Sequence, residues 1–93
     1  MEPASELTVS WFRGLGELQL LTDGPTSIIP DDRFVVRHLS LGPTDDWALQ
    51  IRNLDERLDS GLYQCQTSAD PPQSQFYQLR VVGEYLPALT CAN

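Results

Sequence analysis

Apolar and polar residues alternate with a period of two in several short stretches of this chain. Alternation of this kind puts successive side chains on opposite faces of a β-strand, so each stretch predicts a strand with one buried face. The predicted strands are residues 8–13, 17–22, 26–29, 33–38, 47–51, 62–68 and 76–82. A loop is expected over 39–46, and a short turn or a single helical turn over 53–58. The pattern predicts an antiparallel all-β sandwich.

The most specific stretch is Asp59-Ser-Gly-Leu-Tyr-Gln-Cys-Gln66, which reads D-x-G-x-Y-x-C. A tight turn with Asp and Gly leads into a strand that places Tyr63 and Cys65 on one face. This pattern is typical of strand F in an immunoglobulin sandwich, where the tyrosine hydroxyl bonds back to the turn and the cysteine faces the other sheet. The motif therefore predicts an immunoglobulin-like domain of the variable type.

Other structural residues fit the same fold. Trp11 lies on the first predicted strand, where strand C of such a domain carries the tryptophan that packs in the centre of the sandwich. Arg33 opens strand D and Asp59 opens the corner between strands E and F. The two could form a charge-assisted, bidentate pair across the bottom of the domain, or they could be two solvated surface charges.

Strands A and B of a complete variable-type domain have no counterpart among the predicted strands. Strands A and B come before strand C, but only ten residues precede Trp11 and none of them is cysteine. The fold class is therefore a variable-type sandwich with strands C to G present and strands A and B missing. Residues 8–82 form this partial domain, after a polar lead-in over 1–7. Either the chain is incomplete, which is the favoured explanation, or another chain or an identical copy covers the open face.

The tail over residues 83–93 offers a third explanation. It is either a replacement strand or the start of a second domain. Leu89-Thr-Cys91 reads like a strand B, and Cys91 could then face Cys65 and form a disulfide with it. The favoured prediction is nevertheless two unrelated thiols, because Cys91 follows the last strand of the domain instead of preceding Trp11.

Charge and composition narrow the classes of function. The net charge of −7 disfavours nucleic acid and anionic membranes, which attract clustered Lys and Arg. No apolar run is long enough for a membrane span, and the polar, acidic start of the chain does not resemble a signal peptide.

Catalytic and metal-binding patterns are weak in this sequence. His38 has no nucleophile placed to use it, and the scattered cysteines lack the spacing of a zinc site. The acidic pairs lack the spacing of a calcium loop. We therefore predict a binding protein with no catalytic residues, metal or cofactor, and no small-molecule substrate.

Between residues 8 and 82 the chain resembles one family, the first immunoglobulin domain of the defective-proboscis-extension-response (Dpr) neuronal receptors. The residues that carry the resemblance are Asp32-Arg-Phe34, Thr44-Asp-Asp-Trp-Ala-Leu-Gln-Ile51, Asp59-Ser-Gly-Leu-Tyr-Gln-Cys-Gln-Thr-Ser68, Pro71-Pro72, Leu79-Arg-Val-Val82, and, earlier, Thr8-Val-Ser-Trp-Phe-Arg13 and Leu18-Gln-Leu-Leu-Thr22. The resemblance implies an extracellular, cell-surface receptor that binds Dpr-interacting proteins, and sometimes its own kind, in neuronal wiring and synapse specification. Alternatives are an IgLON-like or generic immunoglobulin-superfamily adhesion protein, and a non-functional fragment that needs a partner chain to fold.

The resemblance also implies a binding face, the sheet of strands G, F, C, C′ and C″. Carried over to this chain, its outward residues are Phe12, Gln19, Thr22, Gln64, Gln66, Phe76 and Gln78. On strand C′ simple alternation would instead expose Leu18 and Leu20. Aromatic side chains among uncharged glutamines suit a desolvated protein interface.

Overall fold

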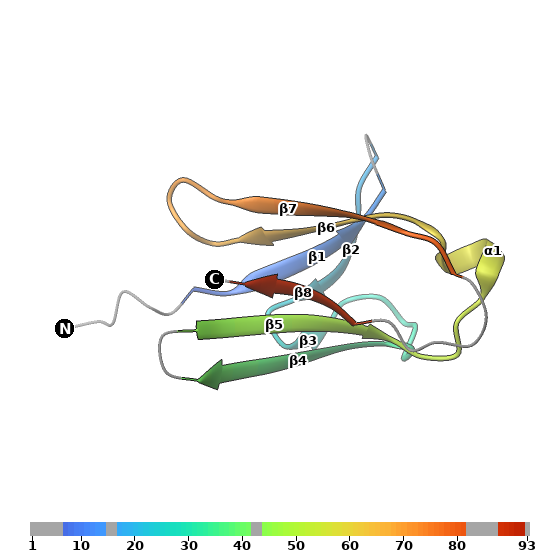
Figure 1. The fold of residues 1–93 in the computed structure, drawn as a ribbon, viewed down its shortest axis with the longest axis horizontal. Coiled ribbons are helices and arrows are strands. Elements are labelled where there is room, and N and C mark those ends of the chain that lie inside the picture. The colour runs from blue at the N-terminus through green and yellow to red at the C-terminus, as the bar shows by residue number, and fades with distance from the viewer. Residues whose placement is uncertain (1–6, 15–16, 42–43, 82–87, 93) are drawn as a thin grey trace.

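The computed structural model describes residues 7–14, 17–41, 44–81 and 88–92 of the 93-residue chain. Its strands form two antiparallel sheets that pack face to face (Figure 1). The larger sheet has the order β3 (Thr26–Ser27), β2 (Gln19–Asp23), β1 (Val9–Arg13), β6 (Gly61–Thr67) and β7 (Ser74–Leu79). The smaller sheet has the order β4 (Phe34–Leu41), β5 (Thr44–Ile51) and β8 (Ala88–Ala92). The predicted antiparallel all-β sandwich is confirmed.

The stretch between β5 and β6 forms the short helix α1 (Glu56–Asp59) at one end of the sandwich. Asp55 caps it, because its side chain accepts hydrogen bonds from the backbone amides of Arg57 and Leu58. The sequence therefore correctly indicated one helical turn here. It placed the turn within residues 53–58, and the structure extends it to Asp59.

The predicted loop over residues 39–46 is wrong. β4 and β5 pair along their whole length as a hairpin, from Phe34 opposite Ile51 to Leu41 opposite Thr44. Pairing of the two strands gives their backbone N–H and C=O groups hydrogen-bond partners. The hairpin therefore extends up to the turn between the strands. The polar residues that suggested a loop are cross-strand neighbours here, because Ser40 lies opposite Asp45.

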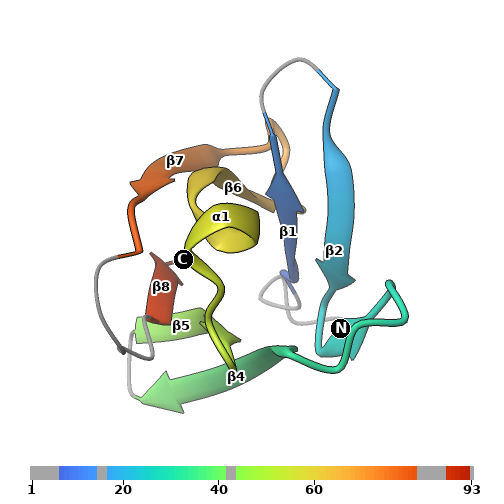
Figure 2. The ribbon, with the colours of Figure 1, turned by 90° about the vertical axis from the view of Figure 1, so that its right-hand side faces the viewer.

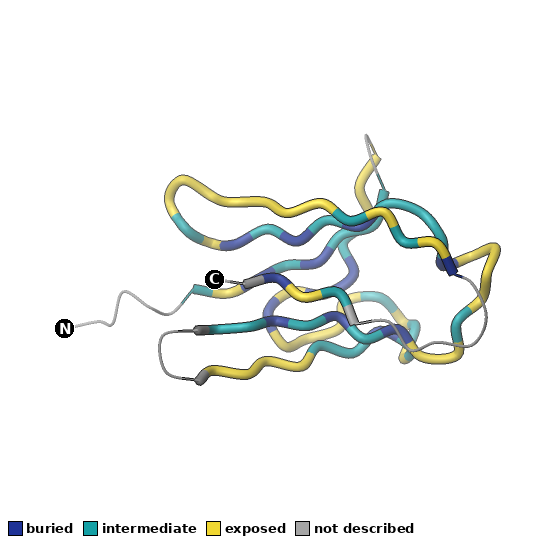
Figure 3. Tube along the Cα trace, in the orientation of Figure 1, coloured by how far each residue is buried: buried dark blue, intermediate teal, exposed yellow. Residues whose placement is uncertain are grey.

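The core lies between the two sheets, where the inward residues of both layers meet (Figure 3). Trp11, Tyr63 and Cys65 enter it from the larger sheet, and Leu49 and Ile51 from the smaller one. All five are fully buried. Burial of a large apolar side chain contributes about 1.5–3 kcal/mol, so this layer dominates the stability of the sandwich.

The tail over residues 83–93 contributes a strand to the sandwich. β8 runs antiparallel to β5, with Trp47 opposite Cys91 and Leu49 opposite Leu89. The order β4-β5-β8 is that of strands D, E and B in a complete variable-type domain. The chain thus fills the place of strand B with residues that follow its last expected strand.

Cys91 and Cys65 form a disulfide between the sheets, with an S–S distance of 2.10 Å and a Cα–Cα distance of 6.2 Å. The prediction of two unrelated thiols is therefore wrong. Cys91 faces inward from β8 and is fully buried, directly across the core from β6. Without β8, Cys65 and its neighbour Trp11 would lose cover on this side, so the strand shields the apolar face of the larger sheet from water.

Candidate protein-binding face

One row of side chains crosses four strands of the larger sheet. Phe12 on β1 lies opposite Leu20 on β2 and opposite Gln64 on β6, and Gln64 lies opposite Phe76 on β7. Residues directly opposite each other in a ladder share a face. Because the alternate residues Trp11, Tyr63 and Cys65 point into the core, this row points away from it.

Neighbouring rows extend the same surface. Ser10 lies opposite Gln66, which lies opposite Ser74, and Leu62 lies opposite Gln78. We call the whole surface the front face; its members are Ser10, Phe12, Leu20, Leu62, Gln64, Gln66, Ser74, Phe76 and Gln78. None of these residues is charged. Asp23 lies at the corner, where Ser10 Oγ donates to its Oδ1 at 3.2 Å.

Five of the predicted partner-binding residues come together on this face. They are Phe12, Gln64, Gln66, Phe76 and Gln78. Phe76 is 64% exposed, which is unusually open for a phenylalanine, whereas the other aromatic residue of the row is half-buried between neighbouring strands. An exposed phenylalanine beside uncharged polar side chains is typical of a protein-binding surface in its unbound state.

The outward placement of Thr22 is wrong. Thr22 has an exposure of 0% and lies opposite Trp11, so it faces the core. The cause is a β-bulge between Trp11 and Phe12, which leaves Leu21 without a partner and turns both Leu21 and Thr22 inward. Simple alternation along β2 therefore predicts the wrong direction for the Thr22 side chain.

Gln19 also differs from its prediction. It is exposed, but it lies opposite Arg13, whose other neighbour is the inward Tyr63, so it belongs to the opposite side of the sheet. The alternative pattern for this strand fits the structure. Leu20 shares the row of Phe12, and Leu18, two residues earlier, is 45% exposed. The edge of the front face near β2 is thus apolar, where the resemblance implied polar residues.

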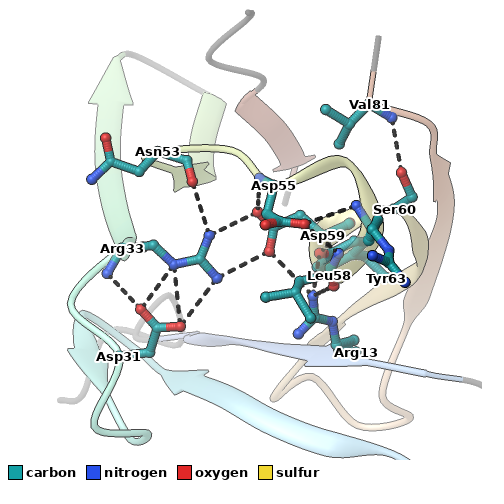
Figure 4. Close-up of polar contacts among 11 residues, drawn as sticks. Arg13, Asp31, Arg33, Asn53, Asp55, Leu58, Asp59, Ser60, Tyr63 and Val81 are labelled. Carbon is teal, nitrogen blue, oxygen red and sulfur yellow. Dashed lines mark hydrogen bonds and ion pairs between the residues drawn. The ribbon is translucent and has the colours of Figure 1, made fainter. Parts of the chain in front are cut away.

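A partly buried ion pair, formed by Arg33 and Asp59, lies at one end of the sandwich (Figure 4). Arg33 Nη1 donates to Asp59 Oδ2 at 2.7 Å, and Nη2 donates to Oδ1 at 3.0 Å. Asp59 is fully buried, and Arg33 also binds the Asp31 carboxylate. The bidentate geometry decides between the two alternatives left open by the sequence, and it excludes two independent surface charges.

The protonation of Asp59 follows from these contacts. Burial disfavours its charged form, but hydrogen bonds from Arg33 and from the backbone amide of Asp55 outweigh burial and hold the pKa of Asp59 below its usual range. The same pair raises the pKa of Arg33. Both groups are therefore charged at neutral pH, and the pair joins the start of β4 to the corner that begins β6.

No family model matches the chain, and no curated protein is significantly similar to it. One solved structure, the first immunoglobulin domain of Dpr1 bound to that of DIP-eta, is 38% identical with a TM-score of 0.68. The match covers 84% of this chain and 70% of the solved one. The first immunoglobulin domain of Dpr11, bound to DIP-gamma, is 34% identical with a TM-score of 0.70, over 88% and 81% of the two chains.

The chain belongs to the Dpr immunoglobulin domains. Identity at this level over most of both chains shows the family as well as the fold. The Dpr-type domain therefore has an immunoglobulin-like sandwich, a fold of binding and adhesion modules rather than of enzymes. The D-x-G-x-Y-x-C element leads into β6 and the inward Trp11 lies on β1, as predicted for strands F and C of an immunoglobulin sandwich.

The tyrosine corner of this Dpr-type domain is formed as its motif predicts. The Tyr63 hydroxyl donates to the backbone carbonyl of Asp59 at 2.6 Å. Burial raises the pKa of Tyr63, so the hydroxyl stays protonated and able to donate. The bond fixes the corner at the start of β6, the strand that carries three members of the front face.

Arg13 is a structural residue that the sequence reasoning missed. Its Nη2 donates to Tyr63 Oη at 3.2 Å and lies 3.4 Å from Asp59 Oδ1, and it also donates to the carbonyl of Leu58. The sequence did indicate that this side chain turns inward. Arg13 is two residues after the inward Trp11 on the same strand, so both side chains lie on the same face. A cation turned inward at the end of a strand indicates a buried partner.

The described residues hold little else that could carry chemistry. Within them, no group of three or more His, Cys, Asp or Glu residues could hold a metal ion. The ring of His38 stacks on Trp47, and its Nε2 lies within hydrogen-bond distance of Asp45 Oδ1. This histidine is thus part of the β4–β5 hairpin. The helix found in the described ranges is too short to cross a membrane.

Proposed function

We propose that this Dpr-type domain binds an immunoglobulin-superfamily receptor of the Dpr-interacting-protein (DIP) type through its front face. The observation that carries the proposal is the uncharged row Leu20–Phe12–Gln64–Phe76, which crosses the larger sheet with an exposed phenylalanine at its end. The similar domains of Dpr1 and Dpr11 were solved bound to DIP-eta and DIP-gamma, which supports a partner of this kind.

The physical basis of recognition is removal of apolar surface from water around a central polar group. Phe12 and Phe76 flank Gln64 on both sides, so a partner that covers the row desolvates the glutamine completely. Aromatic anchors near the centre of an interface typically contribute at least about 2 kcal/mol each. Gln64 can both donate and accept, which lets it select a partner by hydrogen bonding. The proposed binding residues are therefore Phe12, Gln64, Gln66, Phe76 and Gln78, with Leu18 and Leu20 in place of Gln19 and Thr22.

The proposal includes presentation outside the cell and a role in neuronal wiring and synapse specification. The Cys65–Cys91 disulfide supports the first part, because such bonds persist in oxidising compartments. Family membership supports the second. In this setting the domain acts by holding two surfaces together, and its specificity lies in which partner the front face accepts.

The test is direct binding to purified DIP ectodomains, measured by surface plasmon resonance. Gln64→Arg places an unpaired charge at the centre of the row, and we expect a loss of about 2 kcal/mol or more, roughly a thirtyfold drop in affinity. Gln50→Arg is the control on the other sheet, because Gln50 is also half-exposed but lies on β5; circular dichroism checks that it folds, since the variant loses the hydrogen bond from Arg37 Nε. Equal affinities for the two variants would assign recognition to another surface.

A further inference from the structure

The strand that carries Phe76 has less support than its neighbour in the larger sheet. β7 is the last strand in the described order of this sheet, and it pairs with β6 on one side. Four of its six residues are exposed. By contrast β6, which carries Gln64, pairs with β1 on one side and with β7 on the other. A strand with fewer contacts opens more easily, so a link from β7 to the rest of the fold matters for the position of Phe76.

Tyr77, the residue after Phe76, supplies such a link. It lies opposite the inward Tyr63, so its side chain points away from the front face and toward the core. Its ring centroid is 5.8 Å from that of the buried Trp11. Its hydroxyl donates to the backbone carbonyl of Thr90 on β8. Figure 2 shows β7 and β8 on the same side of the sandwich, so Tyr77 joins the two sheets at this side.

The Tyr77 hydroxyl has a second polar neighbour on its own strand. Gln75 Oε1 lies 2.9 Å from it. A hydroxyl has one proton, and a backbone carbonyl can only accept, so the bond to Thr90 takes that proton. The amide of Gln75 can then turn its NH2 group toward the hydroxyl oxygen. The hydroxyl therefore links β7 to β8 and is not occupied by a contact within β7 alone.

The point on β8 to which Tyr77 binds is itself firmly held. β8 pairs with β5 over residues 88–92, and Cys91 is bonded to Cys65 on β6. The Thr90 carbonyl thus belongs to a paired strand and lies next to a covalent link. Tyr77 and Cys65 reach adjacent residues of β8 from adjacent strands of the larger sheet. The two strands β6 and β7 are therefore tied to the same strand behind the front face.

We propose that Tyr77 is a positioning residue for partner binding, which holds β7 and the Phe76 side chain in place through its bond to the Thr90 carbonyl. Phe76 and Tyr77 are consecutive residues on opposite faces of one strand, so a bond on the inner face restrains the outer side chain through the backbone. A side chain that is already ordered loses less conformational entropy on binding. This inference rests on the proposed function, because it concerns the affinity of the front face.

The test is the affinity of Tyr77→Phe for purified DIP ectodomains, DIP-eta and DIP-gamma among them, measured by surface plasmon resonance. The variant keeps the ring and removes the hydroxyl, and we expect the affinity to fall about three- to tenfold, the range set by one hydrogen bond. Ile51→Val is the control for stability. Ile51 is fully buried on β5, so its truncation destabilises the fold but should leave the affinity unchanged. A role of Tyr77 in stability alone predicts the same unchanged affinity for Tyr77→Phe.

A double-mutant cycle shows whether Tyr77 acts through Phe76. If it does, Tyr77→Phe should change the affinity of the Phe76→Ala variant by less than about twofold. Hydrogen exchange measures the positioning itself in the absence of a partner. In free Tyr77→Phe, the amides of β7 that pair with β6 should exchange about three- to tenfold faster than in wild type, while those of β1 stay unchanged.

The outcomes separate this inference from the proposed function. If Phe76→Ala weakens binding and Tyr77→Phe does not, the role of Tyr77 is overturned and the front face stands. Unchanged exchange on β7 in Tyr77→Phe also overturns it. If Phe76→Ala and Gln64→Arg both leave binding unchanged, the proposed function is refuted, and the role of Tyr77 in binding is refuted with it. Circular dichroism and the intact mass verify that each variant is folded and oxidised.

Discussion

The larger sheet and the smaller sheet of this Dpr-type domain are assembled in different ways. In the larger sheet, the central strand β1 is hydrogen-bonded on both sides, to β2 and to β6. The smaller sheet is a local hairpin completed by β8, whose residues come from the far end of the chain. The surface proposed for binding lies wholly on the first sheet. The stability of that surface depends on the second, because β5 and β8 cover the core behind it.

Two links hold the sheets together besides apolar packing. The disulfide joins β6 to β8, and the Arg33–Asp59 pair joins the start of β4 to the corner before β6. They lie on different strands, so each can be removed separately. If the comparison between the sheets is right, breaking either link lowers stability without changing the chemistry of the front face.

The largest effect is expected from Cys91→Ser. It removes the cross-link between residues 26 positions apart, and loss of a native disulfide from a small domain typically costs about 2–5 kcal/mol. We expect the free energy of unfolding to fall by this amount in urea titrations followed by tryptophan fluorescence. A change within about 0.5 kcal/mol of wild type, the range of ordinary surface substitutions, would mean that β8 is held by strand pairing alone.

Thr90→Val is the control for this variant. It changes the neighbouring residue of the same strand at an exposed position and leaves the disulfide intact. Its free energy of unfolding should stay near that of wild type.

The next effect concerns the ion pair and its dependence on pH. Because the pKa of Asp59 is lowered in the folded chain, the stability it contributes is present above the unfolded value near 3.8 and is lost as the pH falls through the folded value. Asp59→Asn leaves Arg33 without its buried partner, and we expect a loss of about 2–4 kcal/mol at pH 7. Below the folded pKa of Asp59 the two proteins should converge.

Urea titrations of wild type and Asp59→Asn between pH 7 and pH 2 measure this difference. Asp32→Asn is the matched control, because Asp32 is exposed and no hydrogen bond or ion pair is described for its side chain. A constant gap between wild type and Asp59→Asn down to pH 2 would show that the carboxylate charge is not what stabilises the corner.

Much of the larger sheet could be predicted from the sequence because its signals are local. Tyr63 and Cys65 follow a turn motif that fixes their direction, and Phe12, Gln64 and Phe76 follow by alternation along regular strands. The Asp59 side chain could be placed at the corner and Arg33 named as its candidate partner, but whether the two pair could not be decided, since ion pairing depends on distances that a sequence does not contain.

The remaining features required information from across the fold. The bulge at Trp11 and Phe12 arises from the register of two strands, and one extra residue was enough to turn Thr22 inward. The place of β8 depends on a contact between the last residues and β5, a pairing that no local pattern fixes. Leu89-Thr-Cys91 carried the correct alternation, but three residues of alternation do not identify a partner strand.

The smallest effect is expected from Thr22→Val, and its sign distinguishes the two faces of β2. Thr22 Oγ1 is buried and has no hydrogen-bond partner among the described residues. Valine has nearly the same shape without the hydroxyl, so the substitution removes an unsatisfied polar group, and we expect a gain of about 1 kcal/mol in the free energy of unfolding. Partner binding should not change, because the side chain faces the core. Leu20→Thr is the contrasting variant: it makes the reverse kind of change on the neighbouring front-face position and should weaken binding more than it affects unfolding. If Thr22→Val weakened binding while leaving stability unchanged, Thr22 would belong to the front face and the bulge could not have turned it inward.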